Sequence, residues 1–155
     1  MAIATFRRND TGQYRVVVLL DSGIGFISQF IADEPEPDTW GGVTIRVEDR
    51  NGDGGDEAWI GYRHIGTGDY LDLDIIELRP ETPDQQWALK ELPKGIVKLA
   101  PGGASVFAAF FTDTDPGCCP SKFDLFGVAW TGIEWVKVNP DLVDAAGLDL
   151  PAGDF

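Results

Sequence analysis

The stretch VTIRVEDRNGDGGDEAWIGY, residues 43–62, decides the fold. Apolar and polar side chains alternate over residues 43–48, and a period of two predicts a β-strand with one buried face. An acidic, glycine-rich loop over residues 49–57 follows, and an apolar segment over residues 58–65 has the composition of a second strand. The stretch therefore predicts two β-strands joined by a tight acidic turn.

Short apolar segments separated by turn residues continue on both sides of this stretch, and 19 glycines and 10 prolines favour frequent chain reversals. Further strands are expected over residues 2–8, 13–20, 24–31, 70–78, 95–99, 104–111, 123–130 and 133–138. The best helix candidate is residues 83–92, with Pro83 near its first turn and Pro93 after its end, although Trp87 and Leu89 also alternate as in a strand. The sequence predicts a mainly β, antiparallel single domain, as a sandwich, a barrel or a propeller-like sheet, with at most one short helix.

The length of 155 residues and the 43% hydrophobic content are sufficient for one packed core. We expect a single β domain over residues 1–140 and an extended acidic tail over residues 141–155. Asp72 and Asp74 alternate with apolar residues, which predicts a solvated strand face or a second, weaker cation site. Most of the tryptophans are expected in the core: Trp59, Trp87, Trp130 and Trp135.

The net charge of −14 excludes nucleic acid as a partner, because its phosphates require Lys and Arg, and it favours divalent cations. No run of about 18 apolar residues exists, so we expect no transmembrane segment. Residues 1–8 lack the features of a signal peptide, which indicates a cytoplasmic protein or a mature chain with an added Met.

The loop over residues 49–57 has the composition of a calcium site, since calcium prefers six to eight oxygen ligands from one tight turn. Side-chain ligands are expected at the alternating positions 1, 3 and 5 of the loop. Gly54 at position 6 permits the sharp reversal. The complete predicted metal set is Asp49, Asn51, Asp53, the backbone carbonyl of Gly55, and Glu57.

The loop has two alternative interpretations. An EF-hand requires a glutamate at position 12, and Ile60 occupies that position. A metal-free hairpin turn is the other alternative, because Asn-Gly and Asp-Gly favour turns. Mutual repulsion of the Asp49, Asp53 and Glu57 carboxylates argues against the metal-free turn. Asp56 is expected to point outward or onto Arg50.

The run Asp-x-Asn-Gly-Asp-Gly-x-Asp-Glu and the strand after it resemble the calcium loop of FG-GAP and VCBS repeats, over residues 47–62. This resemblance implies that the loop binds calcium. The single occurrence of the loop does not imply the propeller of those families.

Two adjacent cysteines, Cys118 and Cys119, lie in a turn-rich loop over residues 112–122. A bridge between them would be strained, because adjacent Cα atoms are about 3.8 Å apart. Zinc is disfavoured because His64, the one histidine, does not complete a tetrahedral set. Two reduced thiols or a link to another chain remain as the other readings.

The segment Asp115-x-x-Cys-Cys-Pro-Ser and the aromatic hairpin after it are similar to the C-terminal part of LppP/LprE-type bacterial lipoproteins. This resemblance implies an extracellular or cell-envelope location and no particular reaction.

No nucleophile elbow, phosphate loop or distinctive pair of carboxylates occurs, so we expect a protein that is not an enzyme. His64 is expected to pair with Asp69 or Asp72 in a structural role. The leading hypothesis is a non-catalytic, calcium-stabilised extracellular or envelope β-domain, a binding or structural module with a protein partner or self-association. The alternatives are a calcium-dependent hydrolase acting on glycans or phosphates and a subunit of a surface layer or filament.

Overall fold

The computed structural model describes residues 2–7, 13–21, 23–35, 39–78 and 85–155. The strands in these residues are β1 (Ala2–Arg7), β2 (Tyr14–Asp21), β3 (Phe26–Asp33), β4 (Trp40–Glu48), β5 (Glu57–His64), β6 (Leu71–Glu77), β7 (Gln85–Leu92), β8 (Ile96–Ala100), β9 (Gly103–Phe110), β10 (Lys122–Trp130) and β11 (Trp135–Asp144). None of the described residues lies in a helix, and thus none forms a helix that could cross a membrane. The prediction of a mainly β, antiparallel fold is confirmed.

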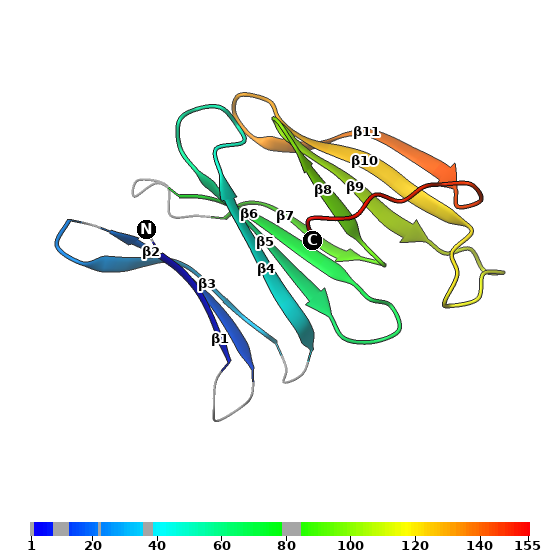
Figure 1. Cartoon of the computed structure of the whole chain (residues 1–155), viewed down its shortest axis with the longest axis horizontal. Helices are drawn as coiled ribbons and strands as arrows, with labels where there is room; N and C mark the ends of the chain where they lie inside the picture. Colours follow the sequence, from blue (N-terminus) through cyan, green and yellow to red (C-terminus); the bar gives the residue numbers. More distant parts are fainter. Residues whose placement is uncertain (1, 8–12, 22, 36–38, 79–84) are drawn as a thin grey trace.

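The strands form three antiparallel sheets in which sequential strands are neighbours: β1-β2-β3, β4-β5-β6-β7 and β8-β9-β10-β11. Tight turns suffice to connect antiparallel neighbours, which agrees with the many glycines and prolines of the sequence. Figure 1 shows the three sheets following one another across the molecule, with β4–β7 in the middle. None of the sheets closes into a barrel, and the packing of sheet on sheet is that of a sandwich.

The middle sheet is buried on both faces. Trp59, Leu73 and Ile75 on one face pack against residues of the sheet β8–β11. On the other face, Ile60 and Tyr62 pack in one cluster with Val16 and Val18 of β2. Successive side chains of a strand point to opposite faces, so a strand between two layers must be apolar at most positions. Residues 57–62 of β5 are accordingly all buried.

The tryptophans are in the core, as predicted. Trp59 and Trp135 are fully buried, with their ring centroids 5.2 Å apart in an edge-to-face arrangement. Trp87 and Trp130 are partly buried and pack against the same cluster. These contacts join the sheet β4–β7 to the sheet β8–β11.

Residues 85–92, the described part of the helix candidate, are not helical. Residues 85–92 form β7, in which Trp87 pairs with Ile75 and Leu89 pairs with Leu73 of β6. Prolines at the ends of the segment are compatible with a helix or a strand, but alternation of Trp87 and Leu89 toward the core fits only a strand. Pairing with β6 therefore outweighed the helix signal of the prolines. The expected helix start, Pro83, lies outside the described residues.

The C-terminal segment packs on the sheets. Strand β11 runs to Asp144, so the domain boundary expected after residue 140 falls within a strand. Asp154 donates its backbone N–H to the Val97 carbonyl at 2.8 Å. The Phe155 ring lies so close to Gly61 that a Cβ on Gly61 would be 2.5 Å from it. The end of the chain thus contacts both the middle sheet and the sheet β8–β11, and Figure 1 shows the C-terminus beside them.

Glu34 joins the sheet β1–β3 to the middle sheet. Its side chain is buried, although it lies in the acidic, proline-containing segment after β3. Oε2 accepts the N–H of Tyr14 and Oε1 accepts the N–H of Trp40, both at 2.6 Å. Because Tyr14 begins β2 and Trp40 begins β4, one carboxylate fixes the starts of two strands in two sheets.

Candidate metal centre

The acidic loop connects β4 to β5, as the sequence predicted, and its glycines bend it sharply. Gly52 and Gly54 have φ angles of 77° and 89°, in the left-handed region that a residue with a Cβ resists. Asp49 holds the resulting turn from inside, because its two carboxylate oxygens accept the N–H groups of Gly52 at 2.8 Å and Gly54 at 3.0 Å. The reversal expected at Gly54 is confirmed.

Three of the predicted ligands come together. One carboxylate oxygen from each of Asp49, Asp53 and Glu57 lies within 4.8 Å of the others. Asp49 and Asp53 are exposed and Glu57 is buried, so the group forms a site at the surface whose inner wall is Glu57. Each carboxylate oxygen has two lone pairs, and an oxygen that accepts one N–H keeps a lone pair for a cation.

The other predicted ligands lie in the same loop. The Asn51 amide contacts Asp53 in two ways: its Oδ1 accepts the Asp53 N–H at 2.9 Å, and its Nδ2 donates to the Asp53 carboxylate at 3.0 Å. Gly55 donates its N–H to Asp53 Oδ1 at 2.9 Å. Ligation by the Asn51 side chain and by the Gly55 carbonyl stays a prediction.

Arg50 does not pair with Asp56. The Asp56 side chain is exposed, which agrees with the expectation that it points outward. The Arg50 guanidinium forms an ion pair with Glu48 and donates to the Ala100 carbonyl at 2.9 Å. Ala100 ends β8, so Arg50 connects the acidic loop directly to the neighbouring sheet.

Glu57 is the unusual member of the group. Its side chain is completely buried, and Oε2 accepts the N–H groups of Arg50 at 2.9 Å and Asn51 at 3.3 Å. Its other oxygen, Oε1, is buried and has no hydrogen-bond partner in the described part of the chain. A buried acceptor without a partner costs about 1–3 kcal/mol, more when it is charged. Burial raises the pKa of Glu57 to about 7.

Glu77 is a neighbour of the site that the sequence reasoning missed. It is buried, it is the direct cross-strand partner of Glu57, and its charge adds to the rise in the pKa of Glu57. The alternation of apolar side chains in β6 could have indicated that Glu77 is buried. Leu71, Leu73 and Ile75 face the core, and residue 77 continues the same face.

The acidic residues of β6 do not form a solvated face. Asp74 is buried and pairs with Lys90 at 2.8 Å. Asp72 accepts the N–H of Glu91 at 2.7 Å and lies 3.3 Å from His64 Nε2. The expected pairing of His64 is therefore with Asp72. The side chains are enclosed because the sheet β1–β3 covers this face of the middle sheet.

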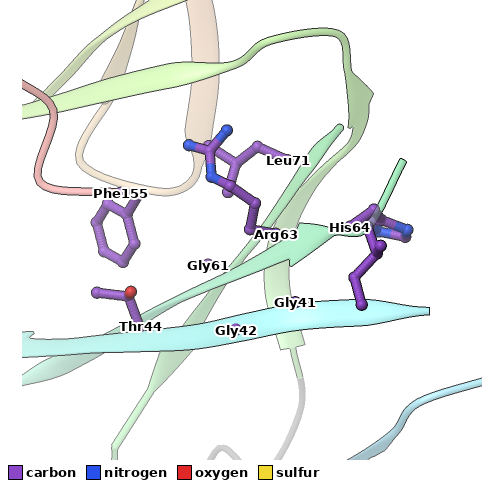
Figure 2. A pocket seen from close by; sticks show the side chains of 9 residues that line it. Gly41, Gly42, Thr44, Gly61, Arg63, His64, Leu71 and Phe155 are labelled. Atoms are coloured by element: carbon purple, nitrogen blue, oxygen red, sulfur yellow. The ribbon is translucent and has the colours of Figure 1, made fainter. Parts of the chain in front are cut away.

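A cavity of about 420 Å³ lies away from the acidic loop, on the middle sheet beside the C-terminal segment. In Figure 2, the Phe155 ring stands beside Gly61 and Thr44, and the His64 imidazole points away from the ring. The Arg63 guanidinium at this cavity already contacts the Gly95 carbonyl at 2.8 Å and Asp69 at 3.1 Å. Among the described residues that line the cavity, none has a carboxylate side chain.

Comparison of the chain with protein-family models, with curated proteins and with solved structures gave no match in any of the three.

Proposed function

We propose that the loop over residues 49–57 binds one calcium ion and that the domain is a non-catalytic, calcium-stabilised β module. The observation that carries this proposal is the buried Oε1 of Glu57, which lacks a hydrogen-bond partner in the described residues, in a group with Asp49 and Asp53. A bound cation would satisfy this oxygen and remove the repulsion among three carboxylates.

Calcium suits this group better than other metal ions. The ligands are carboxylate, amide and backbone oxygens in a flexible loop, and calcium takes six to eight such oxygens at 2.3–2.6 Å, which are typical values for the ion. Magnesium demands a more regular octahedral shell, and zinc prefers nitrogen and sulfur ligands. With two of the three carboxylates exposed, the site resembles the weak sites that fill at extracellular calcium concentrations.

Hydrogen bonds connect the loop to the neighbouring sheet, so a bound ion would stabilise the whole domain. Asn51 and Arg50 donate their N–H groups to Glu57, and the Arg50 side chain donates to the Ala100 carbonyl of the next sheet. An ion that fixes Glu57 and the loop therefore also fixes the contact between two sheets. This is the role of a structural metal ion, which needs no open coordination position for a substrate.

A module fits these observations better than a hydrolase does. The cavity on the middle sheet lies apart from the acidic loop, and none of the described residues that line it has a carboxylate side chain. We propose an extracellular or cell-envelope setting, where millimolar calcium is available, with a protein partner or self-association as the functional contact. Light scattering with and without calcium separates a monomeric module from a subunit of a surface layer or filament.

The test is thermal unfolding with a chelator and with added calcium. Calcium at about 100 times Kd should raise the free energy of unfolding by about 2.7 kcal/mol, which corresponds to a shift of Tm of about 5–10 °C. The variant Asp53→Asn should lose most of this shift. Asp56→Asn removes the same charge at an exposed position of the same loop and should keep it. An equal Tm in chelator and in calcium would overturn the proposal.

A further inference from the structure

The loop between β9 and β10 is tightly ordered around one carboxylate. Asp115 Oδ2 accepts the N–H groups of Thr112 at 2.8 Å and Ser121 at 3.1 Å, and also the Ser121 hydroxyl at 2.9 Å. These donors hold the pKa of Asp115 below its usual range. The two ends of the loop are thereby closed on each other, and the cysteines lie on the closed part.

Cys118 and Cys119 are free thiols, and both are exposed. The Cys119 N–H donates to the Pro116 carbonyl at 2.9 Å, which closes a β-turn through Cys118. A disulfide between adjacent residues must be strained, because their Cα atoms lie about 3.8 Å apart and disulfides favour about 4.4–6.8 Å. The loop is therefore shaped for two adjacent thiols rather than for a bridge.

Cys118 lies at a cavity of about 430 Å³, whose lining also includes Gly117, Lys94 and Thr67. Lys94 belongs to the turn between β7 and β8, and Thr67 belongs to the loop between β5 and β6. Loops from two sheets thus flank the space beside Cys118, and the cationic Lys94 is part of its lining.

The ligand set points to one class of ion. Thiolates are soft ligands and select soft metal ions. Within the described part of the chain, the cysteines are not members of any group of three or more His, Cys, Asp or Glu side chains that could hold a metal ion. This excludes a four-coordinate zinc shell built from those residues and favours an ion that accepts two ligands. We propose that Cys118 and Cys119 form a two-thiolate binding site for Cu(I).

Binding involves no change of oxidation state. Each thiol loses its proton to solvent, two Cu–S bonds form, and the product is a dithiolate complex with one net negative charge. Lys94 then offsets the negative charge of the complex.

The test is an anaerobic titration of the full chain with Cu(I) in competition with the chromophoric chelator bicinchoninate. We expect one ion per chain. Cys118→Ser and Cys119→Ser should each lower the affinity about 100-fold or more, because each removes the chelate. Lys94→Gln should lower it only several-fold. Asp53→Asn, in the separate acidic loop, is the control and should leave Cu(I) affinity unchanged.

Three outcomes would overturn the proposal. A single serine variant that binds as tightly as the unchanged chain would show that the two thiols do not chelate one ion. One ion per two chains would assign the thiols to a bridge between molecules. Protein purified without oxidant that has no titratable thiols, and a mass lower by two hydrogens, would show a Cys118–Cys119 disulfide. Circular dichroism of each variant confirms that folding is intact.

Discussion

Two buried glutamates, Glu34 and Glu57, show how differently one side chain can be used in the same molecule. Both are almost completely buried, and each accepts two backbone N–H groups. Glu34 receives one N–H on each oxygen. Glu57 receives both on Oε2, and Oε1 has no hydrogen-bond partner among the described residues. The Glu34 arrangement is complete within the protein, whereas the Glu57 arrangement is suited to a further ligand.

The elements that supply the donors explain the difference. Tyr14 and Trp40 begin strands in two sheets, so Glu34 is held from two directions by the framework. Arg50 and Asn51 are adjacent residues of one loop and approach Glu57 from the same side. Burial of a carboxylate costs several kcal/mol unless hydrogen bonds or a cation compensate it. We predict that Glu34 stabilises the fold with and without calcium, and that ionised Glu57 does so only with calcium.

The largest effect is expected for Glu34→Ala. Charge-assisted hydrogen bonds contribute about 1.5–3 kcal/mol each, so loss of two should lower the free energy of unfolding by about 3–5 kcal/mol. Urea unfolding should give the same loss in calcium and in chelator. Asp33→Ala is the neighbouring control. It removes an exposed ion pair with Arg15 and should cost less than about 1 kcal/mol. A loss at Glu34 that depended on calcium would break the comparison.

Glu57→Gln should have the next largest effect, and only with calcium present. At calcium concentrations about 100 times Kd, the variant should be about 2–3 kcal/mol less stable than the unchanged chain, because it loses the ion. In chelator the two proteins should be equally stable, or the variant should be the more stable. The reason is that glutamine removes a buried charge next to Glu77. Equal destabilisation under both conditions would assign Glu57 the same purely structural role as Glu34.

The pH dependence of the calcium-free protein sharpens this contrast. Folding raises the Glu57 pKa from an ordinary value of 4.5 to about 7, so the native state binds more protons than the unfolded chain between these values. Stability from protonated Glu57 is complete below about pH 4.5 and is lost as the pH rises through 7, on the order of 1–3 kcal/mol. The free energy of unfolding in urea, measured against pH for the unchanged chain and for Glu57→Gln, gives the part of the pH dependence that comes from Glu57. Saturating calcium should remove the loss, because the ion keeps Glu57 ionised.

Much of the fold could be predicted from local patterns. Alternation located β4 and β6, and the turn residues separated the strands. Of the two possibilities left open for residues 83–92, the helix was wrong and the strand is confirmed for residues 85–92. Pairing with β6 decided between them, and the prolines at the ends of the segment do not encode that contact between segments. The burial of Asp74 was missed for a similar reason. Alternation identifies two faces of a strand, but it does not show that a third sheet covers the polar one.

For the candidate site too, contacts within one loop could be predicted from the sequence and contacts between strands could not. The spacing of Asp49, Asp53 and Glu57 predicted that they meet, because a loop of nine residues imposes its own geometry. The partners from other strands were not predicted: Glu77 beside Glu57, and the Ala100 carbonyl that binds Arg50. Glu34 carries no sequence signal of burial, since acidic residues next to prolines are typical of exposed loops. Its role depends on two sheets meeting at one point.

The smallest effect is expected for Gly54→Ala. This variant tests whether the backbone geometry of the loop and the buried Glu57 carboxylate contribute separately to calcium binding. A Cβ at Gly54 would meet no atom within 4 Å, so the cost is only that of its φ of 89°, about 1 kcal/mol. Gly117→Ala also meets no atom and is not among the left-handed glycines of the described chain, so it should cost less. Calorimetric titration should show weaker calcium binding for Gly54→Ala and none of the pH change expected for Glu57→Gln. A loss of the Glu57 pH slope in Gly54→Ala would show that the loop and the buried carboxylate are one unit.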